Sequence, residues 1–544
     1  TAHRFAATKP LPTYLVALGV GPFDVAEASI PPNDIRKEPV PLRVIATKGQ
    51  ASRMKLAVSE TPKLLAQLEE YFASPYPYEK LDLISTPLLG GAMENAGLIA
   101  FDDTILLLDD DAPFSQLRDF GEINAHELAH QWFGDLVTPT WWTDIWLNEA
   151  FAEWMGKKIG DRWRPDLGIG ATELQDAFGA MQSDSLARGR PIRQEITENR
   201  QINSVFDVIT YRKGAQVLSM FESYMGPEKF AQGIRLHLKR YAHGNASADD
   251  FFVSLSEAAR DPKIVPAMRT FTDQTGVPVV SVDRSGEKLM LSQARYRPQG
   301  VAVGAPQTWM IPLCLSNGEQ RICMLMESAS APAPLPKDTS PLVPNAGGAG
   351  YYRFHLDGYG WDRVISAAPS LPGREALAMA DSIGADFSAG SLSFDRVVSA
   401  ARSLSSNPER LAAVELGTRL KALADFALGP GQLPDYRRLM LSIYGPRLAA
   451  LGFDPRPGAH AREDAGRQAL RQSLVPLVAL EGRDKKVREQ LSAAAGAAVG
   501  GETRAVDMAF RGVALSVAVQ ERGVPFIRQL TDAMVKSTDP LFRA

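Results

Sequence analysis

The stretch His126-Glu127-Leu128-Ala129-His130 opens a segment, residues 126–149, that reads HELAHQWFGDLVTPTWWTDIWLNE. Residues four apart lie on one face of a helix, so both imidazoles can reach one metal ion while Glu127 projects beside them. The chain has only seven histidines in 544 residues, which makes an accidental pair at this spacing rare. The alternative interpretation is an ordinary helix with two buried imidazoles and a surface glutamate.

Glu149 supplies a third candidate ligand. It lies in the segment 145–154, whose apolar residues recur at helical spacing and predict a second helix. Two histidines and one carboxylate leave the fourth position of a tetrahedral zinc ion open for water, which is typical of catalytic zinc. We therefore predict that His126, His130 and Glu149 bind one Zn²⁺ ion per chain, with Glu127 as the general base.

Residues 126–149 resemble the zinc signature of the gluzincin aminopeptidases, peptidase family M1, of the aminopeptidase N type. A second stretch, Gly91-Ala92-Met93-Glu94-Asn95, is similar to the exopeptidase motif of that family. The resemblance implies that residues 91–95 bind substrate, that Glu94 binds its free α-amine, and that the preceding backbone pairs with the peptide like a sheet edge. Taken alone, Glu94 would be a solvated turn residue.

A third stretch, residues 206–214 (FDVITYRKG), resembles the family segment that carries the catalytic tyrosine. The resemblance implies that Tyr211 donates a hydrogen bond to the oxyanion of the tetrahedral intermediate. Asp207 and Glu153 are candidates for orienting a ligand, since metal-bound histidines usually donate their other N–H to a carboxylate or carbonyl. Arg212 and Lys213 are expected to be structural or surface charges without a chemical role.

The resemblance implies a zinc-dependent aminopeptidase that releases N-terminal residues from peptides. Three other functions are compatible with parts of this pattern. A thermolysin-type endopeptidase should lack the Glu94 motif. A bifunctional epoxide hydrolase and aminopeptidase of the same family stays an alternative, although such relatives usually have Gly at the position of Ala92. A non-catalytic peptide-binding module should have lost Glu127 or a ligand, although a weakly active truncated fragment of the family is left as an alternative.

Composition excludes other partners. The net charge of −4 and the lack of a basic stretch argue against nucleic acid. No apolar run approaches 18 residues, so we expect no membrane span, and the short apolar run 14–20 is predicted to be a strand. The expected partners are peptides with a free N-terminus, and the expected state is a monomer.

The length predicts several domains in a multidomain α+β chain. Residues 1–27 are expected to be a remnant of the family's N-terminal β domain, most of which is then missing, and 28–275 a thermolysin-like catalytic domain. From Gly276 the apolar period changes to two, which predicts a small β-sandwich domain over 276–368. Residues 369–544 return to helical spacing and predict an α-helical solenoid, with a truncated C-terminus as an open alternative.

Local patterns predict individual elements. An amphipathic helix is expected to begin at Thr61-Pro62, and a strand over 81–88 to lead into Gly90-Gly91, where missing side chains permit close approach of a ligand. Ser247 is placed as the N-cap of a later helix. The helix from Thr61 should turn one set of apolar side chains inward: Leu64, Leu65, Leu68, Tyr71 and Phe72.

The two cysteines, Cys314 and Cys323, lie in alternating runs, 311–315 and 321–325, that a short turn joins. They can therefore face each other across a hairpin. Two buried free thiols are one interpretation. We favour a disulfide, which predicts an oxidising, extracytoplasmic compartment such as a periplasm; a cytoplasmic location is the alternative.

Overall fold

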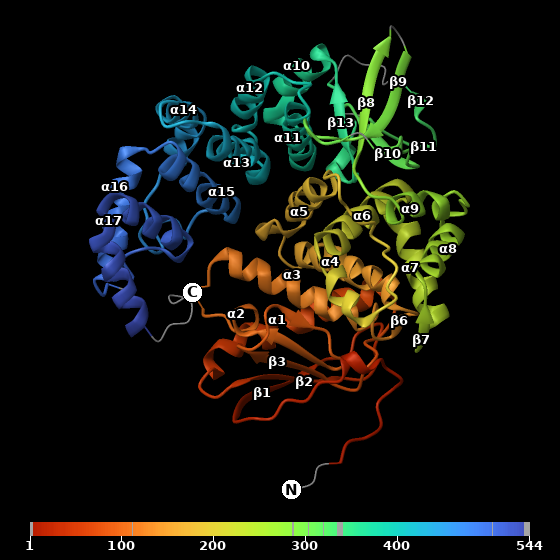
Figure 1. The fold of residues 1–544 in the computed structure, drawn as a ribbon. Coiled ribbons are helices and arrows are strands. Elements are labelled where there is room, and N and C mark those ends of the chain that lie inside the picture. The colour runs from red at the N-terminus through yellow and green to blue at the C-terminus, as the bar shows by residue number, and fades with distance from the viewer. Residues whose placement is uncertain are drawn as a thin grey trace. The chain divides into compact units, whose positions relative to one another are not determined.

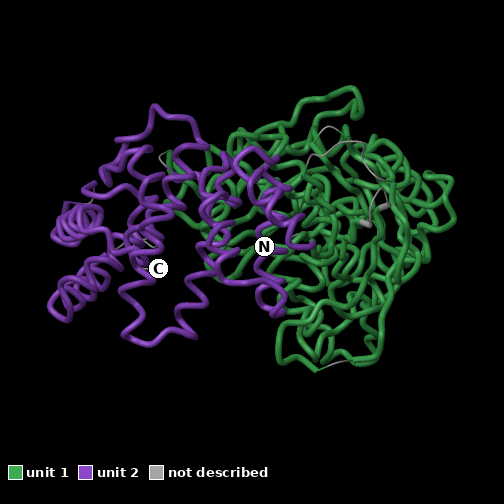
Figure 2. The backbone as a smooth tube through the Cα atoms, turned by 90° about the horizontal axis from the view of Figure 1, so that it is seen from above, with its two compact units in different colours: residues 1–111, 116–356 green, residues 112–115, 357–544 purple. Residues whose placement is uncertain are grey.

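The described residues of the computed structural model are 4–110, 112–285, 288–302, 304–318, 320–334, 341–502 and 504–537. The chain divides into two units, one of residues 1–111 and 116–356 and one of residues 112–115 and 357–544 (Figure 2). The structure is mixed α+β, as predicted, with sheets in the first unit and helices in both. The domain boundaries predicted at residues 27, 275 and 368 stay predictions.

A five-stranded sheet forms the base of the first unit (Figure 1). Its order is β1-β2-β3-β5-β4, so the short strand β4 lies at an edge. β2, β3 and β5 run parallel, whereas β1 and β4 are antiparallel to their neighbours. The strands span Phe23–Ile30 (β1), Val40–Thr47 (β2), Leu81–Thr86 (β3), Ala92–Met93 (β4) and Leu98–Asp102 (β5).

Helix α1, Lys55–Phe72, crosses over from β2 to β3 and contacts β1 and β2. The predicted start at Thr61-Pro62 is wrong, because the helix begins six residues earlier and holds Pro62 in its interior. Ala57 and Thr61 lie four residues apart on the buried face, and packing of that face outweighs the hydrogen bond that proline removes. The five side chains predicted to face inward are all buried.

Helices α3 (Phe114–His130) and α4 (Ile145–Trp163) approach each other closely where glycine replaces a side chain. A Cβ atom on Gly156 of α4 would lie 2.7 Å from the carbonyl oxygen of Glu122 and 3.1 Å from Cβ of His126. Any larger residue at position 156 would therefore push α4 away from the part of α3 that carries the predicted ligands.

Further helices surround this pair: α2 (Asp103–Leu106), α5 (Ile169–Asp184), α6 (Gly214–Met225), α7 (Pro227–Tyr241), α8 (Ala248–Ala259) and α9 (Ile264–Thr272). Along the chain, α3 is followed by the short strand β6 (Val137–Pro139), which pairs with β7 (Gly244–Ala246). Ser247 caps α8 as predicted, since its hydroxyl accepts from the amide of Asp250 and the Asp250 carboxylate accepts from the amide of Ser247.

The predicted strand over 14–20 is wrong. Only a 3₁₀ turn, Thr13–Leu15, forms there, and the first strand begins at Phe23. A strand is held by the hydrogen-bond ladder of a neighbour, and within the described ranges no strand pairs with residues 16–22. The apolar side chains of Val16, Leu18 and Val20 are accordingly exposed.

The later strands form a four-stranded sheet of order β12-β9-β8-β13 and a β10–β11 hairpin. In the hairpin, Cys314 stands directly opposite Cys323, and the two form a disulfide, which confirms the favoured interpretation over two free thiols. The strands span Pro278–Ser285 (β8), Lys288–Arg295 (β9), Ile311–Ser316 (β10), Arg321–Met326 (β11), Ser330–Ala333 (β12) and Arg353–Leu356 (β13).

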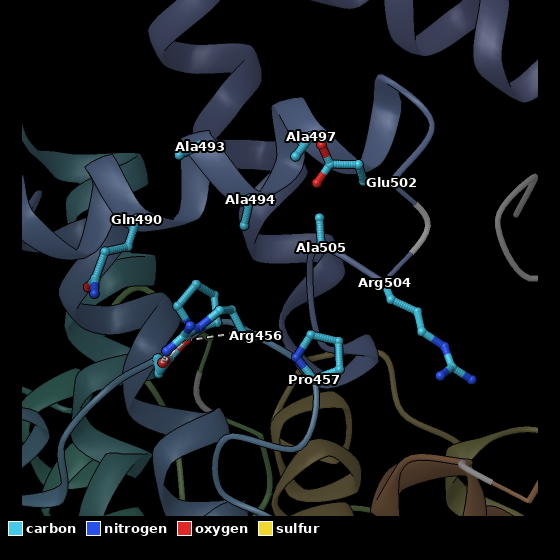
Figure 3. A pocket seen from close by; sticks show the side chains of 11 residues that line it. Arg456, Pro457, Gln490, Ala493, Ala494, Ala497, Glu502, Arg504 and Ala505 are labelled. Atoms are coloured by element: carbon cyan, nitrogen blue, oxygen red, sulfur yellow. Dashed lines mark hydrogen bonds and ion pairs between the residues drawn. The ribbon is translucent and has the colours of Figure 1, made fainter.

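The second unit is helical. A surface hollow of about 780 Å³ lies there, between the loop 454–457, helix α16 and the loop that follows it (Figure 3). No helix in the described parts of the chain is both long and apolar enough to span a bilayer. The solenoid stays a prediction. The helices span Gly358–Ala367 (α10), Gly373–Ser388 (α11), Phe394–Leu404 (α12), Arg410–Ala427 (α13), Leu433–Leu451 (α14), Ala465–Pro476 (α15), Lys485–Val499 (α16) and Arg511–Lys536 (α17).

The disulfide gives a direct chemical prediction. Unfolded protein treated with a thiol-alkylating reagent should gain no alkyl group at Cys314 or Cys323 until a reductant is added, and then one at each, as measured by mass spectrometry. Alkylation of unfolded protein without reductant would show free thiols and contradict the hairpin cross-link.

Candidate active site

The three predicted metal ligands converge. His126 and His130 lie on α3 with their Nε2 atoms 3.1 Å apart. Glu149, on α4, places Oε2 at 3.8 Å from the first of these nitrogens and 3.5 Å from the second. Two adjacent helices thus bring three buried donor atoms to one point, as the sequence pattern predicted.

These donors fit a zinc ion. Tetrahedral zinc with bonds of about 2.0–2.1 Å separates neighbouring ligand atoms by about 3.3 Å, and the three observed separations lie on either side of this value. Burial would raise the pKa of Glu149, but hydrogen bonding and attraction from His126 and His130 lower it below its usual range. The carboxylate is therefore in the charged form that metal binding requires.

The outer nitrogens of the two histidines face oxygen atoms, which leaves each Nε2 for a metal. Nδ1 of His130 lies 3.0 Å from the carbonyl oxygen of Phe133. Nδ1 of His126 lies 3.7 Å from Oε2 of Glu153, and the orienting role of that carboxylate stays a prediction. Glu153 is held in turn by the buried ammonium of Lys157, 3.5 Å away.

Asp207, the other candidate for orienting a ligand, does not do so. Its carboxylate pairs with Arg190 and accepts from the backbone amides of Ile209 and Thr210. Asp207 therefore caps the beginning of the turn that carries Tyr211, a role that a carboxylate at the start of a helical turn commonly has.

Glu127 is buried beside the ligands, and its Oε2 atom has no hydrogen-bond partner among the described residues. Burial raises its pKa well above the usual value; His130 opposes this shift, and Glu94 and Glu149 add to it. A general base that later acts as an acid must both take and return a proton, and a raised pKa favours the return step.

Tyr211 lies on a π-helical turn, Ile209–Lys213, and its ring centroid is 6.3 Å from that of His126. Burial, and then the neighbouring carboxylate of Glu149, raise the pKa of the phenol above its usual value. The phenol is therefore neutral near pH 7 and can donate a hydrogen bond to an oxygen that gains negative charge.

Glu94 follows the edge strand β4, which pairs with β5 on one side only. It is buried, and ligand atoms of Glu94, Glu127 and His130 all lie within 4.8 Å of one another. Gly91, with φ +102°, adopts a backbone conformation that favours glycine at the start of this edge. The amine-binding carboxylate predicted from the motif thus lies next to the metal ligands.

The other motif residues lie around Glu94. Ala92 and Met93 form β4 and are half-buried. The side-chain amide of Asn95 donates to the carbonyl oxygen of Leu15 at 3.2 Å and so ties the N-terminal segment to the motif. The substrate contacts predicted for Gly91, Ala92, Met93 and Asn95 stay predictions.

One structural contributor was missed from the sequence. The Gln131 side chain donates to the carbonyl oxygen of Glu94 at 2.9 Å and accepts from the amide of Gly97 at 3.0 Å, so it joins the motif to the end of α3. The one sequence feature that could have indicated this role is the position of Gln131 directly after His130. Lys213, expected to be a structural or surface charge, is completely buried against Asp184.

We predict that Gly156→Ala will disturb the metal site. The added methyl group meets backbone and His126, so α4 and Glu149 must move away from α3. Overpacking of this kind costs about 1–3 kcal/mol, measurable by urea unfolding, and zinc affinity measured by chelator competition should fall with it.

Gly512→Ala is the matched control, because Gly512 is also helical but nothing lies within 4 Å of its added Cβ. This control should keep its zinc affinity. Unchanged stability and unchanged zinc affinity in Gly156→Ala would contradict the close-packing argument.

Comparison with known proteins agrees with this geometry. The chain matches the model of the peptidase family M1 domain over residues 56–271 and that of the ERAP1-like C-terminal domain over residues 342–543. It is 32% identical to Aminopeptidase M1-C of Oryza sativa subsp. japonica over 498 residues, which is 88% of this chain and 55% of that protein. It is 38% identical to Aminopeptidase M1 of Arabidopsis thaliana over 322 residues, 58% of this chain and 36% of that protein.

An archaeal relative, Probable aminopeptidase 2 of Sulfurisphaera tokodaii (strain DSM 16993 / JCM 10545 / NBRC 100140 / 7), is 35% identical over 355 residues, 65% of this chain and 44% of that protein. The chain spans about half the length of the curated relatives that it matches along most of its own length. With both domain models matched and related aminopeptidases from plants and an archaeon, the chain is a member of peptidase family M1.

Proposed function

We propose that this chain is a zinc-dependent aminopeptidase that releases N-terminal residues from peptides with a free N-terminus. The observation that carries the proposal is the position of Glu94, whose carboxylate lies within 4.8 Å of ligand atoms of both Glu127 and His130. A buried anion at this distance from the reacting groups can hold an α-ammonium group so that the first peptide bond lies at the metal.

His126, His130 and Glu149 would hold the zinc ion. When bound, the ion would lower the pKa of a water molecule toward neutrality and polarise the carbonyl of the scissile bond. The separations of the three donor atoms and the lowered pKa of Glu149 support this assignment.

Glu127 takes the proton of the attacking water and returns it to the leaving amine. Its burial beside the ligand atoms of Glu94 and His130 supports this role. Tyr211, kept neutral by its own raised pKa, donates a hydrogen bond to the oxygen that becomes negative in the tetrahedral intermediate. Such a donor contributes about 3 kcal/mol to stabilisation of the transition state.

Substrate binding follows from the edge position of β4. The outer side of this strand offers backbone groups that can pair with an extended peptide. A peptide that pairs antiparallel to β4 would have its N-terminus at Glu94, which follows the end of the strand. A peptide that continued past Glu94, or an acetylated one, would meet a buried carboxylate without a cation to neutralise it.

The names of the plant and archaeal relatives support an aminopeptidase activity for this chain. We also propose an extracytoplasmic location, which the disulfide between Cys314 and Cys323 supports, and a solenoid arrangement for the helices from α10 onward.

Glu127→Gln should lower kcat by about 10²- to 10⁴-fold while zinc content is retained, because the substitution removes the base without removing a ligand. Hydrolysis of aminoacyl fluorogenic substrates and metal analysis measure the two effects. The control Glu228→Gln, at an exposed position of α7, should leave both unchanged. Zinc binding without hydrolysis by the unsubstituted chain would instead indicate a binding module or a weakly active fragment.

Glu94→Gln should weaken binding of peptides with a free N-terminus, because an amide cannot neutralise an α-ammonium group. We expect KM for such peptides to rise by at least tenfold, which corresponds to about 1.4 kcal/mol, and the preference over N-acetylated peptides to shrink. Cleavage of N-acetylated peptides by the unsubstituted protein at a comparable rate would contradict the role of Glu94.

A further inference from the structure

The turn that carries Tyr211 is an unusual element. Residues Ile209–Lys213 form a π-helical turn, which then continues as α6. Such turns are rare because their hydrogen bonds span five residues, and they persist where surrounding structure holds them. The position of the Tyr211 phenol therefore depends on what holds the two ends of the turn.

The first end is held by Asp207. Its carboxylate accepts from the amides of Ile209 and Thr210, and Arg190 binds both this carboxylate and the Thr210 hydroxyl. This pair is partly exposed to solvent.

The second end is held by a fully enclosed ion pair. Nζ of Lys213 lies 2.8 Å from Oδ2 of Asp184, the last residue of α5, and both side chains have no exposed surface. Oδ1 of Asp184 also accepts from the amide of Gly276 at 2.7 Å, and Oδ2 accepts from the hydroxyl of Tyr351 at 3.1 Å. Lys213 donates in addition to the carbonyl oxygen of Gln274 at 3.1 Å.

This ion pair thus joins four parts of the first unit: the end of α5, the turn that carries Tyr211, the segment 274–276 before β8, and Tyr351 before β13. Burying an ion pair rarely stabilises a fold more than apolar residues of similar volume would, but it does impose one geometry on its partners. The many buried partners of Lys213 and Asp184 therefore favour a role in fixing geometry over a role in stabilising the fold.

The next residue, Gly214, shows where the turn that carries Tyr211 lies relative to α4. A Cβ atom on Gly214 would lie 2.4 Å from Cβ of Ala150, the neighbour of Glu149 on α4. The start of α6 therefore presses against α4 beside a predicted metal ligand. Because Lys213 is held in place, the turn stays in contact with α4 at Ala150. Tyr211, two residues before Lys213, is thereby held beside His126 and Glu149.

We propose that Lys213 and Asp184 are positioning residues that hold the Tyr211 phenol beside the metal ligands, and that this position is tied to the packing of Gln274, Gly276 and Tyr351. The proposal rests on the proposed function of Tyr211 as the donor to the oxyanion. Lys213 and Asp184 would then affect catalysis although neither is a predicted metal ligand or substrate-binding residue.

A double-mutant cycle tests the proposal. Asp184→Asn and Lys213→Met should each lower kcat about 10- to 100-fold, as expected when a group is displaced by about 1 Å, with KM changed by less than about threefold. In a Tyr211→Phe background the same substitutions should change kcat by less than about twofold, because the group that they position is already gone. Equal losses in both backgrounds would overturn the proposal.

A milder variant and a control complete the experiment. Tyr351→Phe removes one hydrogen bond to Asp184 at nearly constant volume, and it should lower kcat about 2- to 10-fold only while Tyr211 is present. If Asp184→Asn and Lys213→Met do not fold, the same cycle with Tyr351→Phe decides the question. Arg471→Met is the control, since it removes an equally buried cation from the helical unit; any loss of kcat there should be the same with and without Tyr211.

Hydrogen–deuterium exchange separates this proposal from the proposed function. Asp184→Asn should accelerate exchange of the amides of residues 209–214 and leave those of α3 unchanged, whether or not the protein hydrolyses peptides. If the unsubstituted protein cleaves nothing, the proposed function fails while exchange still tests the positioning. Unchanged exchange over 209–214 would overturn the positioning itself.

Discussion

The close contact between α3 and α4 is the constraint on which the site depends. At Gly156 the two helices approach until backbone of one meets backbone of the other, with His126 beside the contact. Glu149 lies about two helical turns before Gly156 on α4, on the part of the helix that faces the histidines. A single small residue thus decides whether three donor atoms from two helices can share one ion.

The electrostatics of the site follow from its burial. Glu94, Glu127 and Glu149 are enclosed together, and a group of enclosed carboxylates is unfavourable unless cations compensate it. Burial raises the pKa of Glu94 and of Glu127, whereas the two histidines lower that of Glu149. The three carboxylates are therefore not equivalent, because the pKa of the predicted metal ligand is lowered whereas the pKa values of the other two are raised.

A shell of supporting side chains surrounds the residues that act. Gln131 joins the Glu94 motif to α3, and Glu153 with Lys157 faces His126. Lys213 and Asp184 join the Tyr211 turn to α5 and to the segments that flank the later sheets. Each contact ties an acting residue to an element far away in sequence, so the precision of the site is a property of the whole first unit.

The candidate metal ligands could be predicted from local sequence pattern. The spacing of His126, Glu127 and His130 and the helical period around Glu149 predicted the ligand set, because four-residue spacing puts side chains on one helix face whatever surrounds it. Local rules also placed the Ser247 cap and the opposed cysteines, since each depends on residues within about ten positions of one another. Resemblance to the family added Glu94 and Tyr211, whose side chains carry no local signal of their own.

Features that depend on distant partners could be seen only in the folded chain. The run 14–20 has the composition of a strand but lacks a neighbouring ladder, and α1 extends six residues before the predicted start because Ala57 and Thr61 complete a buried face. Asp207 lies near Tyr211 in sequence, yet Arg190 binds it and directs it away from the metal ligands. Lys213 is an unremarkable charge in the sequence, and its burial against Asp184, Gly276 and Tyr351 arises from packing between segments up to 167 residues apart, which local pattern cannot encode.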